Sequence, residues 1–228
     1  MRVRVTITVL GVTTAALLAV PACSTDTAAK PETTASARTG KPAGDTLLSS
    51  VALEQRLLDE RDLGNGYLRK SERPTQHDDV TVVGCPALSE LGGDAATGGS
   101  LAFPRKAEVT FTYADNTNSE VSEELYSDGA NKLSDGIGRI FGAMTGCPTY
   151  RIVAGGTAID IASQRLAAPH GLGDEQWSQL LTFSAGGRST MMKQTAIRDG
   201  SVLLIVSGSP ALVDRHLEKA LAKATTAS

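Results

Sequence analysis

Apolar and polar residues alternate along several stretches of this chain, which is the pattern of strands with one buried face. The clearest stretch is 107–114, where alanine, valine, phenylalanine and tyrosine alternate with glutamate and threonine. Two shorter stretches, 150–153 and 157–162, flank a Gly-Gly pair and predict a hairpin. One or two further strands are expected between residues 68 and 84.

Three longer strands are predicted near the end of the chain, over 176–184, 188–198 and 201–208. The last two are separated by Asp199-Gly200, a pair that favours the type I′ turn of a two-residue hairpin. These strands therefore predict an antiparallel meander.

Apolar residues three or four positions apart predict three helices. A short one begins at Ser50 as N-cap, and the longest is expected over 117–144, with Thr117 and Glu120 as its capping box. The last begins at Pro210, a residue suited to the first helical position. Glu123, Glu124 and Asp128 would then belong to the solvated face of the long helix.

Together these elements predict an α+β fold, with an antiparallel β-sheet and the helices packed on one face as a two-layer sandwich. A chain of 228 residues, 41% of them hydrophobic, is long enough for one ordinary domain once its ends are set aside. We divide it into 1–22, 23–48 and 49–226.

The first segment has the pattern of a bacterial export signal. Arg2 and Arg4 precede an uncharged stretch over 5–20, and Leu18–Cys23 resembles the lipobox of bacterial lipoproteins. The resemblance implies cleavage before Cys23 and attachment of lipid to its sulfur, which would anchor the protein to the outer face of the cytoplasmic membrane. The alternative is an ordinary signal peptide followed by a cysteine.

Residues 24–45 consist of small, polar and proline residues with almost no large apolar side chain. Such a composition cannot bury enough surface to offset the entropy of ordering. We therefore expect a flexible tether that keeps the folded domain near the membrane.

Two cysteines remain, Cys85 and Cys147, and each is followed by proline. In an exported domain an even remainder favours a disulfide, which would stabilise the fold by about 4 kcal/mol. The alternatives are two buried thiols or a zinc site, for which the chain offers too few nearby ligands. A helical turn is expected over 86–91.

Several short phrases resemble the extracellular sensor domain of PknH-type receptor kinases and related lipoproteins, over about residues 50–226. They are Leu57-Leu58 with Asp62-Leu63 and Gly66-Tyr67, then Cys85-Pro86-Ala87-Leu88, then Gly171-Leu172-Gly173-Asp174-Glu175. The resemblance implies a ligand bound in a cleft between sheet and helices, and no catalytic residue. Because the chain carries no kinase domain or transmembrane helix, and one candidate disulfide instead of two, any signalling role would need a partner.

We expect a membrane-anchored lipoprotein whose sensor-like domain binds a small ligand, lipids included, or a partner in the cell envelope. The candidate ligand-binding cleft comprises Tyr67, Tyr113, His170, Asp174 and Trp177, on the face between the sheet and the long helix. Neither a cofactor nor a metal is expected, and the absence of a basic stripe argues against nucleic acid.

No catalytic motif is present, so we do not expect an enzyme. The alternative from another class is an envelope hydrolase built around His170, Asp174 and Glu175, which share a glycine-rich stretch. A purely structural interaction domain is the third alternative.

Overall fold

The computed structural model describes residues 46–71, 80–92, 95, 103–114 and 119–226. The predicted signal peptide, the lipidation site at Cys23 and most of the tether lie outside the described residues. Thr117, the predicted cap of the long helix, lies outside them as well.

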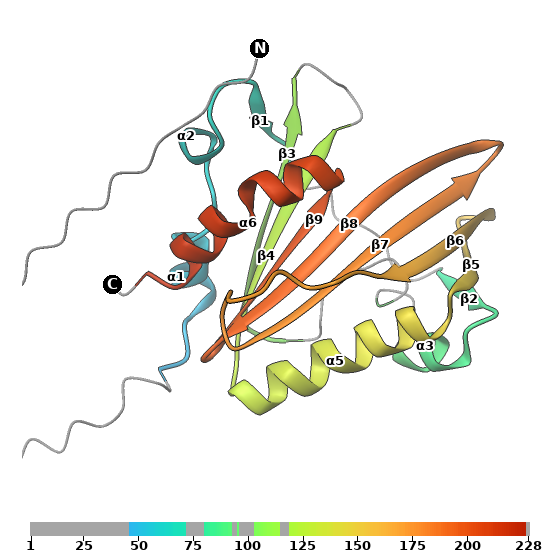
Figure 1. The fold of residues 1–228 in the computed structure, drawn as a ribbon, viewed down its shortest axis with the longest axis horizontal. Helices are drawn as coiled ribbons and strands as arrows, with labels where there is room; N and C mark the ends of the chain where they lie inside the picture. Colours follow the sequence, from blue (N-terminus) through green and yellow to red (C-terminus); the bar gives the residue numbers. More distant parts are fainter. Residues whose placement is uncertain (1–45, 72–79, 93–94, 96–102, 115–118, 227–228) are drawn as a thin grey trace, which may run out of the picture. The chain divides into compact units, whose positions relative to one another are not determined.

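Nine strands form one antiparallel sheet in the order β1-β3-β4-β9-β8-β7-β6-β5-β2 (Figure 1). The predicted strands after residue 149 are all present, and Gly155-Gly156 form the predicted turn between β5 and β6. The turn between β8 and β9 lies one residue later than predicted, at Gly200-Ser201, because Asp199 pairs with Val202 as the last residue of β8. Because β9 lies between β4 and β8, the sheet is not a simple meander. The strands are β1 (Tyr67–Arg69), β2 (Thr81–Val83), β3 (Lys106–Tyr113), β4 (Glu120–Ser127), β5 (Thr149–Ala154), β6 (Thr157–Arg165), β7 (Glu175–Ala185), β8 (Arg188–Asp199) and β9 (Val202–Gly208).

Two very short helices replace the single N-terminal one that was predicted. Ser49, not Ser50, caps the first by accepting a hydrogen bond from the Ala52 amide. Asp59 and Asp62 form a reciprocal capping box on the second. The helices are α1 (Ser50–Glu54), α2 (Glu60–Leu63), α3 (Pro86–Leu91), α5 (Ala130–Gly146) and α6 (Pro210–Ala224). In the described part of the chain, no helix is long and apolar enough to cross a membrane.

The prediction of a helix over 117–144 is wrong for its first half, because Glu120–Ser127 is strand β4. Val121 and Leu125 are four residues apart, a spacing that fits one face of a helix and also one face of a strand. Pairing with β3 on one side and β9 on the other decides in favour of the strand. The helix itself begins only after Gly129.

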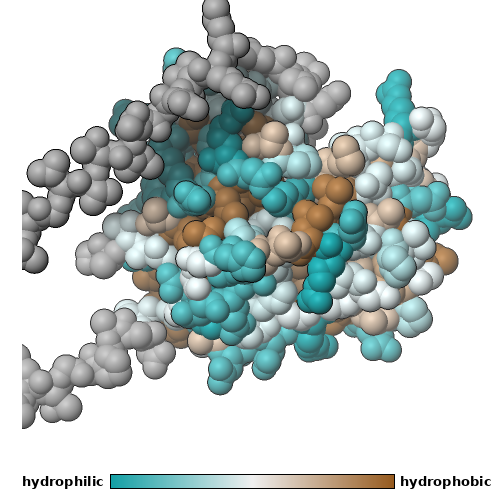
Figure 2. All heavy atoms as spheres, viewed as in Figure 1, coloured by the Kyte–Doolittle hydropathy of each residue, from teal (hydrophilic) through white to brown (hydrophobic). Residues whose placement is uncertain are grey.

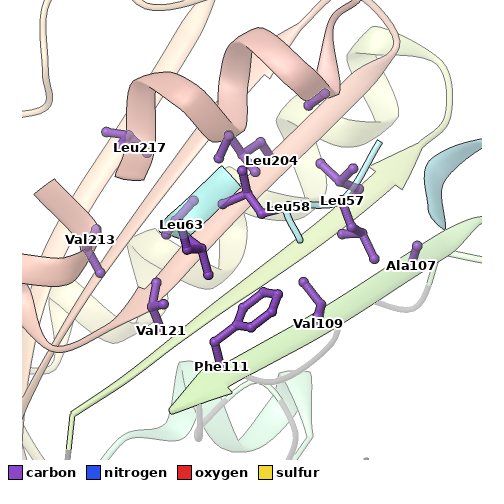
Figure 3. Close-up of a cluster of buried hydrophobic side chains, with 14 of the residues drawn as sticks. Leu57, Leu58, Leu63, Ala107, Val109, Phe111, Val121, Leu204, Val213 and Leu217 are labelled. Atoms are coloured by element: carbon purple, nitrogen blue, oxygen red, sulfur yellow. The ribbon is translucent and has the colours of Figure 1, made fainter. Parts of the chain in front are cut away.

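The helices cover both faces of the sheet, whereas the sequence predicted one. Consecutive residues of β9 show this: Val202, Leu204 and Val206 pack with α1, α2 and α6, while Leu203 and Ile205 pack with α5. Figure 3 shows the first of these clusters, with Leu57, Leu58 and Leu63 directed at the sheet. The α+β class is confirmed, with helices above and below the sheet.

The predicted disulfide between Cys85 and Cys147 is confirmed, with 5.8 Å between the two Cα atoms. Cys85 immediately precedes α3, and Cys147 immediately follows α5. The bridge therefore ties α3 to the end of the long helix, on the α5 side of the sheet, beside a core cluster that includes Leu88, Met144 and Leu181.

Candidate ligand-binding surface

The side of the sheet that carries α6 is covered over only part of its width. Helix α6 packs on β4, β8 and β9. Lys193 of β8 marks this side, because its ammonium group bonds to Asp214 of α6. Lys193 is paired with Leu180 of β7, and Leu180 is paired with Gln164 of β6, so all three side chains point to this side of the sheet. Gln164 is exposed.

We call the part of this side that α6 leaves uncovered the open face. Residues paired across β2, β5, β6, β7 and β8 share it, since directly opposed residues point to the same side of a sheet. Most of them are exposed, and the rest are half-buried. They are Val83, Thr149, Arg151, Asp160, Ala162, Thr182, Ser184 and Met191.

A hollow of about 480 Å³ lies on the open face over β2, β5, β6 and β7. Ala162 lines it, together with Thr149 and Thr182, its partners on the neighbouring strands. Small side chains surrounded by the longer Arg151 and Asp160 leave a concave surface. The hollow is open to solvent, and its volume falls within the range of ligand-binding clefts.

One opposite-charge pair lies at the rim of the hollow. Arg151 Nε donates to Asp160 Oδ1 at 2.7 Å, and both side chains are more than half exposed. The same hydrogen bond lowers the pKa of Asp160 and raises that of Arg151, so both groups are charged at neutral pH. Val83 and Met191 add exposed apolar surface, at 51% and 58%. The open face thus offers charge, hydroxyl groups and apolar contact together.

No family model and no curated protein sequence matches this chain. Among solved structures, it is similar to the extracellular domain of PknH from Mycobacterium tuberculosis, with a TM-score of 0.60 at 11% identity, over 79% of this chain and 98% of that one. The chain has a PknH-like fold. An uncharacterized Mycobacterium smegmatis protein, the Rv0999 ortholog, matches with a TM-score of 0.39 at 9% identity, over 74% of this chain and 97% of that one.

Within this PknH-like fold, the five residues of the predicted cleft do not lie together. Tyr67 and Tyr113 are in contact on the α6 side, with ring centroids 4.8 Å apart and ring planes tilted by 47°, and the Tyr67 hydroxyl lies 2.7 Å from Nε2 of His216. Trp177 packs with the α5 cluster on the opposite side. His170 is exposed in the loop between β6 and β7.

The fifth cleft residue, Asp174, anchors that loop. Its carboxylate accepts from Arg198 Nη1 at 2.9 Å and from the Gly200 amide at 3.0 Å. Glu175 accepts from Arg198 Nη2 at 2.7 Å and from the Ser134 hydroxyl at 2.6 Å. The Gly200 bond lowers the pKa of Asp174, and the Arg198 bond lowers that of Glu175. Both carboxylates are therefore ionised and engaged in tying the loop to the β8–β9 turn and α5.

The space between α5 and the sheet, where the cleft was expected, is filled among the described residues by apolar side chains. They include Leu133, Ile137 and Phe141 from α5 and Leu203 and Ile205 from β9. No group of three or more potential metal ligands lies within the described residues. The hollow on the open face is consequently the site that the geometry favours.

Sequence reasoning assigned Glu123 and Glu124 to a solvated helix face, but both lie on β4. Glu123 is 2% exposed, accepts from the Leu58 amide at 2.7 Å, and burial raises its pKa to about 8. Glu124, on the opposite side, accepts from the Tyr126 hydroxyl, and burial raises its pKa to about 7. No local signal separates them from a helix face, because the spacing of Val121 and Leu125 suits a helix and a strand alike, and only pairing with β3 and β9 decides.

Proposed function

We propose that this chain is an exported, lipid-anchored protein of the cell envelope whose sensor-like domain binds a small ligand or an envelope partner on the open face. The observation that carries the proposal is the hollow of about 480 Å³ on a sheet surface that the described helices leave uncovered. Figure 2 shows apolar patches bordered by polar side chains on the visible side of the molecule.

Three further observations support it. The lipobox-like segment ending at Cys23 favours export and lipid attachment. The disulfide suits an oxidising compartment outside the cytoplasm. The fold is shared with a domain described as extracellular, although at 11% identity that similarity bears on the fold alone.

The chemistry of the hollow favours a ligand or partner that is itself polar with some apolar surface. Arg151 uses one N–H on Asp160, and a guanidinium carries five, so donors remain for an incoming acceptor. Thr149, Thr182 and Ser184 add hydroxyl groups along the hollow. Exposed ion pairs contribute little to stability, so exchanging this one for contacts with a ligand costs the fold little.

Native mass spectrometry of the protein purified from its own envelope tests this proposal. Ala162→Arg fills the hollow from an exposed position, and Ala222→Arg makes the same change at an exposed position of α6. Wild type and Ala222→Arg should carry an added mass that leaves on denaturation, and Ala162→Arg should lack it. The same spectrum for all three proteins, with or without an added mass, would contradict the open face as the site.

A further inference from the structure

Glu123 places a carboxyl group in the middle of the apolar cluster between the sheet and helices α1, α2 and α6. Its neighbours across the sheet are Val109 on β3 and Val206 on β9, and both are buried. One oxygen, Oε2, accepts from the Leu58 amide at 2.7 Å. The other, Oε1, is buried and has no hydrogen-bond partner in the described part of the chain.

The Leu58 amide belongs to the N-terminal strap, which we define as residues 49–63, comprising α1, α2 and their connection. Leu53, Leu57, Leu58 and Leu63 pack the strap against the apolar cluster, and polar contacts also hold it on the domain. They include a bond from the Lys106 amide to Ser50 Oγ at 3.3 Å, a bond from Lys219 to the Asp62 carbonyl, and the following three. Glu123 binds Leu58, Arg56 Nη1 donates to the carbonyl of Ala224 at 3.0 Å, and Lys223 bonds to Asp62. Of these polar contacts, only the one between Glu123 and Leu58 is made in the apolar interior.

The charged groups facing Glu123 come from α2 and α6. Burial raises its pKa, whereas the Leu58 amide, which would bond an ionised carboxylate more strongly, lowers it. Lys223 also lowers the pKa and Asp62 raises it, but the ammonium group of Lys223 is already bonded to Asp62. Lys219 of α6 lies 3.6 Å from the same aspartate. His216 of α6 is engaged with Tyr67, and Glu54 of α1 is exposed. Strands β3 and β9 present valines, so burial outweighs every other influence.

We propose that the proton on Glu123 is a latch that holds the N-terminal strap on the sheet, and that losing this proton loosens the strap. A neutral carboxyl is tolerated in an apolar cluster, whereas an ionised one without a partner is strongly disfavoured. The ionised form gains by admitting water beneath the strap, or by drawing Lys223 away from Asp62. Either change weakens the contact of α2 with α6.

The strap lies near the start of the described chain, directly after residues 46–48, where the Leu48 amide donates to Ser127 Oγ of β4 at 2.9 Å. A proton-controlled strap would set how firmly α1 and α2 cover this side of the sheet. This inference concerns the α6-covered part of the molecule and does not depend on ligand binding at the open face.

Amide hydrogen exchange of the full chain at matched pH tests the latch, with Glu123→Gln as a variant that stays neutral. Dividing the wild-type rate by the variant rate cancels the intrinsic pH dependence of exchange. For amides of residues 51–63, this ratio should rise by up to about a hundredfold between about pH 6 and about pH 9, since the pKa is about 8 when the strap is closed and near 4.5 when it is open. Glu54→Gln, at an exposed position of the strap, should follow wild type.

A ratio that stays constant across this range would overturn the proposal. So would strap amides whose opening free energy equals that of the amides of β4 and β9, because equal values would indicate unfolding of the whole domain and not opening of the strap. If the variant fails to fold, the carbon-13 shift of the Glu123 carboxyl in the wild-type chain decides. A midpoint near 8 supports the latch, and one near 4.5 overturns it.

Discussion

At the scale of single residues, the buried carboxyl of Glu123 links the stability of the domain to pH. Its pKa is about 8 in the folded chain and near 4.5 in an exposed one, so the folded state keeps a proton that the unfolded chain has already lost. This contribution to stability is complete below about pH 4.5, falls as the pH rises to about 8, and stays constant above that. The loss is a few kcal/mol and at most about 5.

We therefore expect Glu123→Gln to flatten the fall in the free energy of unfolding between about pH 5 and about pH 8. Urea unfolding followed by circular dichroism at several pH values measures this, with Glu54→Gln as the exposed control. Parallel curves for wild type and Glu123→Gln would show that Glu123 ionises normally.

A second residue-scale prediction concerns Gly208, which ends β9 beside the start of β4. Its φ is 141°, and a Cβ there would lie 2.1 Å from the carbonyl oxygen of Glu120. Gly208→Ala should cost about 2 kcal/mol or more, because the two backbones must separate. Gly142→Ala, on an exposed turn of α5 with no atom near its Cβ, should instead stabilise by up to about 1 kcal/mol. Urea midpoints that move in the same direction for both would contradict this contrast.

At the scale of elements, the disulfide is the strongest local constraint on the α5 side. It closes a sequence separation of 62 residues, for which chain entropy predicts about 4 kcal/mol of stabilisation. Replacing both Cys85 and Cys147 by serine should lower the free energy of unfolding by about that amount. Reducing agent should destabilise wild type to a similar extent and leave the double variant unchanged. A reductant effect of equal size on the variant would assign the loss to another cause.

Elements whose signals are local could be predicted from the sequence. Asp199-Gly200 indicates the β8–β9 hairpin, whose turn is formed by Gly200 and Ser201, and Ser209-Pro210 indicates the start of α6. The stretch 120–127 could not be assigned in the same way, because its apolar spacing suits both a helix and a strand. Pairing with β9, some 80 residues later in the chain, decides it, and such pairing leaves no local signal.

At the scale of the whole molecule, the position of the candidate site depends on which strands the described helices cover. The α+β class and the disulfide could be predicted, but the insertion of β9 between β4 and β8 could not. That insertion places α6 over one half of the sheet and leaves β2, β5, β6 and β7 open on the same side. The residues of the predicted cleft were chosen by residue type alone. Asp174 instead anchors the loop between β6 and β7 through its hydrogen bond with Arg198.

The central claim, that the open face is exported and occupied in the envelope, predicts a difference in thiol labelling on intact cells. Ala162→Cys places a thiol in the hollow, and Ala222→Cys places one at an exposed position of α6. A membrane-impermeant maleimide should label position 222 equally in cells and in the purified protein, but should label position 162 much more slowly in cells. Equal labelling of position 162 in both settings, or no labelling of either position on intact cells, would contradict the account.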